Sequence, residues 1–225
     1  LVIANNVLAH VPDINDFVAG ISTLLNEHGT ITFEFPHLLN LLQFFQFDTI
    51  YHEHYSYLSL KVVERICAKH KLYVYDVEQL PTHGGSLRIY ASRSNRSVSK
   101  NVETIKLLED SFLNCGLENA NLAPYNNLKA TALDIKYNLI SLLIELKKQG
   151  KVVVGYGAAA KGNTLLNYCG IKKDLLPLIA DKAVSKQNQL MPGSRIPIVS
   201  PEKIEEINPD YILVLPWNLI DEIKA

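Results

Sequence analysis

The chain has 225 residues, 48% of them hydrophobic and 20% charged, which is enough to bury one large core or two smaller ones. Its 22 basic and 23 acidic residues leave a formal net charge of -1, so charge favours neither nucleic acid nor an anionic membrane as a partner. No stretch reaches the roughly 20 apolar residues of a membrane-spanning helix. We therefore expect a small-molecule partner, no nucleic acid and no membrane.

The three cysteines lie far apart and form no C-x-x-C pair; they are Cys67, Cys115 and Cys169. This spacing indicates neither a zinc site nor a disulfide framework, and it favours a reducing, cytoplasmic location. The chain begins without an initiator methionine, and its first four residues, Leu1-Val2-Ile3-Ala4, have the apolar pattern of a buried strand. Because a buried parallel strand needs neighbours, we expect a further N-terminal part to precede it.

The first 95 residues alternate strand and helix patterns. Residues 13–29 carry apolar residues at helical spacing and end on Gly29, and Ser59 predicts the N-cap of a second helix. The strand patterns cover residues 1–6, 30–36, 72–80 and 86–92, the last two on either side of a glycine-rich turn. Strand, helix and strand in this order predict a crossover unit of an α/β sheet.

The pattern becomes helical from about Asn101. Apolar residues then alternate spacings of four and three, at Leu128, Ala132, Ile135, Leu139, Leu142 and Leu146. They predict the seam of one long connecting and packing helix that stops at Gly150. Strand and helix patterns alternate again over residues 151–168, 175–181, 197–207 and 210–217, which predicts a second α/β unit.

Residues 51–59, YHEHYSYLS, concentrate groups that carry protons. Because a histidine has an ordinary pKa of about 6.5, His52 and His54 are the first candidates for a general base. In an extended segment Tyr51 and Glu53 face away from the two histidines, whereas in a helical turn Tyr51 neighbours His54. A Tyr/His-rich loop packed on a helix is the structural alternative, and a zinc site built from His52, Glu53 and His54 is a weaker one.

Residues 151–164, KVVVGYGAAAKGNT, read as a buried strand that runs through glycines into a helix. This arrangement receives phosphate groups on backbone N–H groups at the helix N-terminus. The candidate contacts are Gly155, Tyr156, Gly157, Ala158 and Lys161, and the G-x-G-x-x-A spacing also fits a dehydrogenase, with Asp181 as its ribose-binding acid. A tight turn without a ligand is the structural alternative, and the order of glycine and lysine excludes the phosphate loop of ATPases.

Residues 82–88, THGGSLR, combine a histidine, paired glycines and an arginine. The glycines Gly84 and Gly85 allow a ligand to approach the backbone closely. His83 stands beside them, and Arg88 can bind a phosphate through two parallel hydrogen bonds. An ordinary hairpin turn with a surface arginine explains the same residues.

Five motifs, spread in order over essentially the whole chain, resemble the sugar C-methyltransferases that act on nucleotide-linked keto-deoxysugars. They are ANNVLAHVPD (4–13), TFEFPH (32–37), YHEHYSYLS (51–59), THGGSLR (82–88) and GYGAAAKGNTLLN (155–167). In that family a zinc-binding N-terminal segment precedes a Rossmann-like S-adenosylmethionine domain and a C-terminal α/β domain. The chain matches the end of the second part and most of the third.

The resemblance implies an α/β fold class with a partial Rossmann-like methyltransferase domain, a connecting helical segment and a second Rossmann-like α/β domain. The expected boundaries are 1–95, including a substrate-site insert, 96–150, and 151–225 for sugar-nucleotide binding. Zinc and the glycine-rich S-adenosylmethionine loop then belong to segments outside this chain. The chain alone is accordingly expected to hold no metal and to be inactive.

The resemblance also implies roles for individual residues. His54 is the base that removes the C3 proton of a dTDP-linked 4-keto-deoxysugar, and His10 bonds the C4 oxygen. Tyr51 and Glu53 match positions near the sugar and are expected to be catalytic together with the two histidines, whereas Asn5 and Asn6 match cofactor contacts at the carboxyl end of a strand. The residues expected to contact the sugar nucleotide are His83, Gly84, Gly85, Arg88, Gly155, Tyr156, Gly157, Ala158 and Lys161. An NAD-dependent oxidoreductase or epimerase and a non-enzymatic nucleotide-sugar-binding module are the alternatives.

Overall fold

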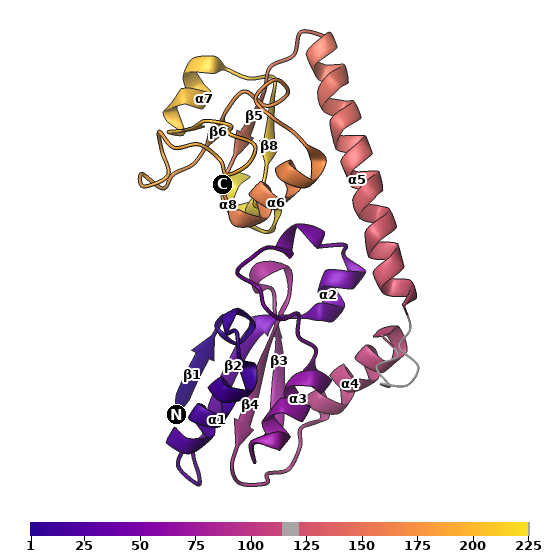
Figure 1. The fold of residues 1–225 in the computed structure, drawn as a ribbon, viewed down its shortest axis with the longest axis vertical. Coiled ribbons are helices and arrows are strands. Elements are labelled where there is room, and N and C mark those ends of the chain that lie inside the picture. The colour runs from indigo at the N-terminus through magenta and orange to yellow at the C-terminus, as the bar shows by residue number, and fades with distance from the viewer. Residues whose placement is uncertain (114–121, 225) are drawn as a thin grey trace. The chain divides into compact units, whose positions relative to one another are not determined.

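A computed structural model describes residues 1–113 and 122–224, so Cys115 lies outside the described residues. The described part is an α/β protein with two four-stranded sheets, which confirms the predicted α/β class, whereas the Rossmann-like character of the two domains remains a prediction (Figure 1). Its contacts divide the chain into two compact units. Unit 1 comprises Leu1–Gln46 and His52–Leu128, and unit 2 comprises Phe47–Tyr51 and Lys129–Ala225. The domain boundaries expected at residues 95 and 150 remain a prediction.

Unit 1 is built on a mixed sheet. Its strands lie in the order β1 (Val2–Asn5), β2 (Ile31–Pro36), β4 (Ser86–Ser92) and β3 (Tyr73–Leu80) (Figure 1). Its helices are α1 (Ile14–Leu24), α2 (Leu38–Gln43), α3 (Leu60–Lys69) and α4 (Lys100–Leu113). Strands β1 and β2 are parallel with α1 between them in the chain, as predicted, and β4 is antiparallel to both β2 and β3.

Short-range signals set the ends of the unit 1 helices. The side chain of Asp13 accepts hydrogen bonds from two N–H groups of the first turn of α1, both at 3.0 Å. Ser59 accepts from the N–H of Val62 at 3.3 Å, so the predicted cap of α3 is confirmed. The predicted end of α1 at Gly29 was wrong, because Leu25 already leaves the helical region with a ψ of 129°.

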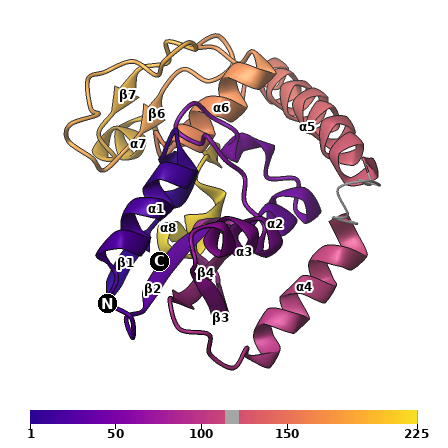
Figure 2. The same cartoon turned by 60° about the horizontal axis from the view of Figure 1, so that its bottom comes forward.

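The core of unit 1 lies between the sheet and its helices. Phe33, Phe35, Leu87 and Ile89 are fully buried on β2 and β4. Helices α3 and α4 lie side by side (Figure 2) and are linked by the ion pair between Lys106 and Glu64. This packing places the start of α3, which directly follows residues 51–59, against α4.

Unit 2 holds a parallel sheet in the order β7 (Ile198–Val199), β6 (Ile179–Ala180), β5 (Val153–Tyr156) and β8 (Tyr211–Val214). The remaining helices are α5 (Ala123–Lys148), α6 (Ala160–Cys169), α7 (Glu202–Ile207) and α8 (Ile220–Lys224). Strands and helices alternate along this part of the chain, as predicted. The strand predicted over 175–181 has only two residues, because a turn in which Leu175 and Leu176 bond Lys172 takes up its start.

Helix α5 is the long helix that the apolar spacing predicted, and it is unbroken in Figure 1. Its seam differs from the prediction at one position, since Leu142 is 52% exposed whereas Leu143 is 2% exposed and packs in the core of unit 2. A spacing of three or four residues fits a helix equally well, so sequence alone did not separate these neighbours. Within the described parts of the chain, no helix combines the length and the apolar run that crossing a membrane requires.

Candidate functional site

Two of the predicted site histidines lie together in unit 1. The ring centroids of His10 and His54 are 4.9 Å apart, and the rings meet edge to face at 78°. Tyr57 adds a third ring, 6.0 Å from that of His54 and nearly perpendicular to it. The structure thus brings the predicted base and the predicted partner of the C4 oxygen to one place.

Backbone hydrogen bonds hold this arrangement. The carbonyl of Ala9 accepts from the N–H of Tyr55 at 2.9 Å and from that of Ser56 at 3.3 Å. Ala9 belongs to the short 3₁₀ helix Leu8–His10, which follows β1. Residues 51–59 are therefore attached, next to His54, to the turn that carries His10.

Asn5 and Asn6 lie at the carboxyl end of β1, and both are exposed. Asn6 adopts a left-handed backbone conformation with a φ of 53°, which asparagine tolerates better than most residues. Its N–H bonds the carbonyl of Glu34 at 2.8 Å and so keeps this end of β1 beside β2. Asn5 and Asn6 are therefore exposed at the end of β1, just before the 3₁₀ helix that carries His10.

Residues 51–53 form a bend and a turn, so neither the extended nor the helical alternative describes them. Glu53 and its neighbour His52 are exposed, and Tyr51 is grouped with unit 2 rather than with the histidine pair. Among residues 1–113 and 122–224, no group of three or more His, Cys, Asp or Glu side chains is placed to hold a metal ion. The zinc alternative for His52, Glu53 and His54 therefore finds no support in the geometry.

A buried ionisable pair lies where residues 51–59 end, and the sequence analysis missed it. Nε2 of His37 is 2.8 Å from Oε1 of Glu109, and the two side chains are 3% and 0% exposed. Glu109 also accepts from the N–H groups of Leu60 at 2.6 Å and Lys61 at 3.1 Å, which are the first two residues of α3. One carboxylate on α4 thus holds both His37 and the N-terminus of α3.

The glycine turn of residues 82–88 is shaped by its protein neighbours. Gly85 has a φ of 114°, and a Cβ there would lie 2.0 Å from Nδ2 of Asn40. The carbonyl of Gly84 accepts from Nε2 of Gln46 at 2.7 Å. His83, with a φ of 56°, is exposed. The space that the missing side chain of Gly85 leaves is therefore filled by Asn40.

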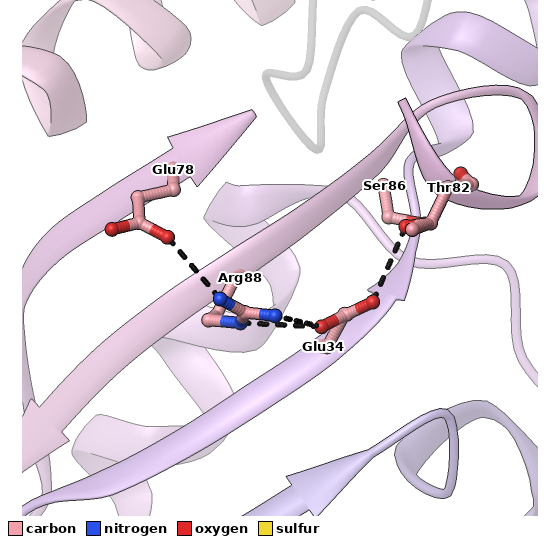
Figure 3. A network of polar contacts seen from close by, with 5 residues as sticks. All are labelled: Glu34, Glu78, Thr82, Ser86 and Arg88. Atoms are coloured by element: carbon pink, nitrogen blue, oxygen red, sulfur yellow. Dashed lines mark hydrogen bonds and ion pairs between the residues drawn. The ribbon is translucent and has the colours of Figure 1, made fainter. Parts of the chain in front are cut away.

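Arg88 takes part in a network on one face of the unit 1 sheet, where it lies opposite Glu34 on β2 and Glu78 on β3 (Figure 3). Its Nη2 donates to Oε2 of Glu34 at 2.7 Å, and its Nη1 is 3.5 Å from Oε2 of Glu78. Oε1 of Glu34 accepts from Thr82 at 3.2 Å, and Ser86 donates to the Thr82 carbonyl at 3.0 Å. A phosphate must compete with Glu34 for this guanidinium.

Two backbone N–H groups in the glycine loop of unit 2 donate hydrogen bonds to other residues of the protein. The N–H of Gly157 bonds the carbonyl of Ala180 at 2.7 Å, and that of Ala158 bonds Oδ2 of Asp181 at 2.7 Å. Burial tends to raise the pKa of Asp181, but the N–H groups of Ala183 and Ala158 and the Lys186 ammonium outweigh it and lower this pKa. Asp181 is thus a charged support of the loop.

Lys161, in the first turn of α6, lies among polar and aromatic groups of unit 2. Its Nζ donates to Oδ1 of Asn218 at 2.7 Å and lies 4.7 Å from the ring centroid of Trp217. Burial lowers the pKa of Lys161, and the charge of Asp48 opposes this shift. Burial raises the pKa of Asp48, while the Trp217 hydrogen bond and Lys161 oppose it. The charged forms of Lys161 and Asp48 therefore stabilise each other in a partly buried environment.

Comparison with known proteins decides the family. Residues 81–225 match the model of the C-methyltransferase C-terminal domain. The chain belongs to the C-methyltransferase family. It is 36% identical over 223 residues to the C-methyltransferase NovU of Streptomyces niveus, an alignment that covers 99% of this chain and 52% of that relative. The chain thus spans about half the length of the curated relative that it matches, and the sugar C-methyltransferase resemblance is confirmed.

The sequence analysis missed three polar groups that the structure joins to other residues: Asp48, Trp217 and the pair formed by His37 and Glu109. His37 offered a signal, since it closes the TFEFPH motif. Glu109 offered none, because a glutamate on an amphipathic helix is ordinarily a solvent-facing residue. Asp48 and Trp217 lie 169 residues apart, so no local pattern joins them.

Replacing Gly157 by alanine is expected to destabilise unit 2. Gly157 has a φ of 86°, and a Cβ there would lie 2.4 Å from Cδ of the buried Pro216. Overpacking and left-handed strain together predict a loss of about 2–4 kcal/mol in the free energy of unfolding, measured in urea. Gly170→Ala is the matched control, because its φ of 75° brings the strain but no atom lies within 4 Å. Equal losses at the two glycines would show that packing against Pro216 does not matter.

Proposed function

We propose that the full-length protein is an S-adenosylmethionine-dependent C-methyltransferase that methylates C3 of a dTDP-linked 4-keto-deoxysugar. Membership of the C-methyltransferase family supports methyl transfer to a carbon atom. The observation that carries the proposal is the contact between the rings of His10 and His54, 4.9 Å apart beside the carboxyl end of β1. Two imidazoles at one place supply both a proton acceptor and a hydrogen-bond donor.

The C4 ketone of the sugar makes the hydrogen on C3 acidic, so a positioned neutral imidazole can remove it. In our proposal His54 accepts this proton, and the C–H electron pair becomes the enolate whose negative charge gathers on the C4 oxygen. His10 donates a hydrogen bond to that oxygen. By analogy with an oxyanion-hole donor, this bond lowers the barrier by at most about 3–4 kcal/mol.

The nucleophilic carbon then needs an electrophilic methyl group, which bound S-adenosylmethionine supplies. The residues of this chain that fit contact with the cofactor are Asn5 and Asn6, because their amides are exposed at the carboxyl end of β1. Ligands of α/β sheets bind at such strand ends. We assign these two residues to holding the cofactor beside the histidine pair.

We propose that the sugar nucleotide contacts residues of both sequence motifs that are rich in glycine. The strand order of unit 2, with β5 between β6 and β8, supports a Rossmann-like half in which ligands bind at the carboxyl ends of these strands. Lys161 offers a cation there. The remaining proposed contacts are Tyr51, Glu53, His83, Gly84, Gly85, Arg88, Gly155, Tyr156, Gly157 and Ala158.

The oxidoreductase alternative receives less support from the geometry. Its ribose-binding acid would be Asp181, whose Oδ2 is bonded to Ala158 and Lys186 and whose Oδ1 is bonded to Ala183. A carboxylate that is already bonded on both oxygens is poorly placed to bind two ribose hydroxyls. Family membership and this occupied carboxylate both favour methyl transfer.

Hydrogen exchange tests the proposed chemistry. The full-length protein and a dTDP-linked 4-keto-deoxysugar are incubated in D₂O without S-adenosylmethionine, and deuterium at C3 is followed by NMR. We expect exchange at C3, and after addition of S-adenosylmethionine a sugar that is heavier by one methyl group. Turnover that needs NAD(H) and leaves C3 unexchanged and unmethylated would refute the proposal in favour of the oxidoreductase.

A further inference from the structure

Tyr57 contacts the proposed base directly, and both residues belong to unit 1. The ring centroids of Tyr57 and His54 are 6.0 Å apart, and the two rings are nearly perpendicular, at 88°. The ring of His10 lies 4.9 Å from the same imidazole, at 78°. Aromatic rings prefer such edge-to-face contacts at centroid distances of about 4.5–7 Å. The imidazole of His54 therefore meets one ring from the His10 turn and a second ring from its own loop.

Hydrogen bonds within unit 1 fix the backbone on both sides of Tyr57. Before it, the N–H of Tyr55 donates to the carbonyl of Ala9 at 2.9 Å. After it, the carbonyl of Leu58 accepts the N–H of Leu38, the first residue of α2, at 2.9 Å. Leu58 is itself only 3% exposed. The point from which the Tyr57 side chain projects is therefore set by bonds to two other parts of the unit.

The side chain of Tyr57 is half-buried and packs against a small apolar cluster. The buried members of this cluster come from α2 and from the end of α4: Leu39, Leu41, Leu42 and Leu113. Since the ring of Tyr57 also contacts His54, it connects the imidazole to a packed part of unit 1. A side chain supported in this way can restrict the ring beside it.

The residues before His54 give it less support. His52 and Glu53 are exposed and lie in a turn, and His54 itself is half-buried. A side chain that is only partly packed keeps rotamer freedom unless its neighbours restrict it. The contacts with the rings of His10 and Tyr57 supply such a restriction.

We propose that Tyr57 is a positioning residue for His54, and that its ring holds the imidazole in the orientation that accepts the C3 proton. The inference rests on the proposed role of His54. A general base acts only within hydrogen-bond reach of the proton, and a misplacement of about 1 Å can reduce the rate about 10²-fold. In this role Tyr57 touches the base rather than the reacting atoms. Its loss slows proton removal and leaves the binding of the sugar nucleotide unchanged.

The test is C3 hydrogen exchange in D₂O by the full-length protein with Tyr57→Leu or Tyr57→Phe. Leucine keeps an apolar contact with the cluster but removes the ring, so kcat for exchange should fall about 10-fold or more. The affinity for the sugar nucleotide, measured by calorimetry, should stay near that of the unmodified protein. Phenylalanine keeps the ring that contacts His54 and should restore most of the rate. Equal losses of kcat in the two variants would overturn the role of the ring.

A double-mutant cycle separates positioning from a general structural role. In protein that already carries His54→Asn, Tyr57→Leu should reduce the residual exchange no further, because the side chain that Tyr57 positions is gone. A merely structural role instead lowers the rate by the same factor in both backgrounds. That result would overturn the proposal.

Tyr55→Leu is the matched control, since it makes the same substitution two residues earlier in the loop. The side chain of Tyr55 is 62% exposed, and the bond of this residue to Ala9 is made by its backbone N–H. Tyr55→Leu should therefore retain the exchange rate. A loss as large as that of Tyr57→Leu would show that the contact with His54 is not what matters, and it would count against the proposal.

The outcomes distinguish the positioning role from the proposed function. An unchanged kcat in folded Tyr57→Leu overturns the positioning role and leaves the proposed function intact. Absence of exchange in the unmodified protein overturns the proposed function and the positioning role with it. Should Tyr57→Leu fail to fold, Tyr57→Met decides by the same criteria, because the flexible methionine side chain fills irregular apolar space without supplying a ring.

Discussion

The full-length protein with His54→Asn is expected to lose methyl transfer by about 10²–10⁴-fold, the usual contribution of a general base. Asparagine is close to histidine in size and keeps polar contacts, but its amide does not accept a proton near neutral pH. Deuterium exchange at C3 should fall by the same factor, because it needs only the proton-removal step. The affinity for the sugar nucleotide, measured by calorimetry, should stay near that of the unmodified protein.

His52→Asn is the matched control for this prediction. His52 is exposed and stands two residues before His54, outside the contact between the His10 and His54 rings. It should retain both exchange and methyl transfer. Near-normal turnover by His54→Asn, or equal losses at both positions, would remove His54 from the role of base and also remove the reason for pairing it with His10.

Replacing Glu109 by alanine should destabilise unit 1 strongly. The carboxylate is fully buried, faces His37 at 2.8 Å and accepts the N–H groups of Leu60 and Lys61. Removing this buried carboxylate should cost about 3–5 kcal/mol, because the groups bonded to it lose their partner without regaining water. The free energy of unfolding in urea should fall by this amount.

The neighbouring Asp110 provides the control for Glu109. It pairs with Lys61, but its side chain is 48% exposed, so Asp110→Ala should cost less than about 1 kcal/mol. Comparable small losses at the two positions would show that the buried pair contributes little. A large loss at Glu109 alone would establish that α4 secures the start of α3, and with it the end of residues 51–59.

Much of the fold could be predicted from residues close together in the sequence. Ser59 caps α3 through a bond to Val62 three residues on, and the alternation of residues 86–92 gives β4 with the predicted ends. Such signals are local, because caps and periodicity involve groups a few residues apart. The ordered motifs also sufficed to place the chain in its family. The spacing of apolar residues on α5 was less decisive, since Leu142 and Leu143 both fit it.

The candidate site depended on contacts that no local pattern encodes. His37 and Glu109 are 72 residues apart, and Asp48 and Trp217 are 169 apart, so only the folded chain makes them partners. Side chains such as Glu109 look solvent-facing in the sequence, because burial depends on which element packs against them. The sequence by itself therefore determined the elements, the family and the candidate histidines. Tertiary packing alone decided which polar groups are buried together, since that depends on how distant segments meet.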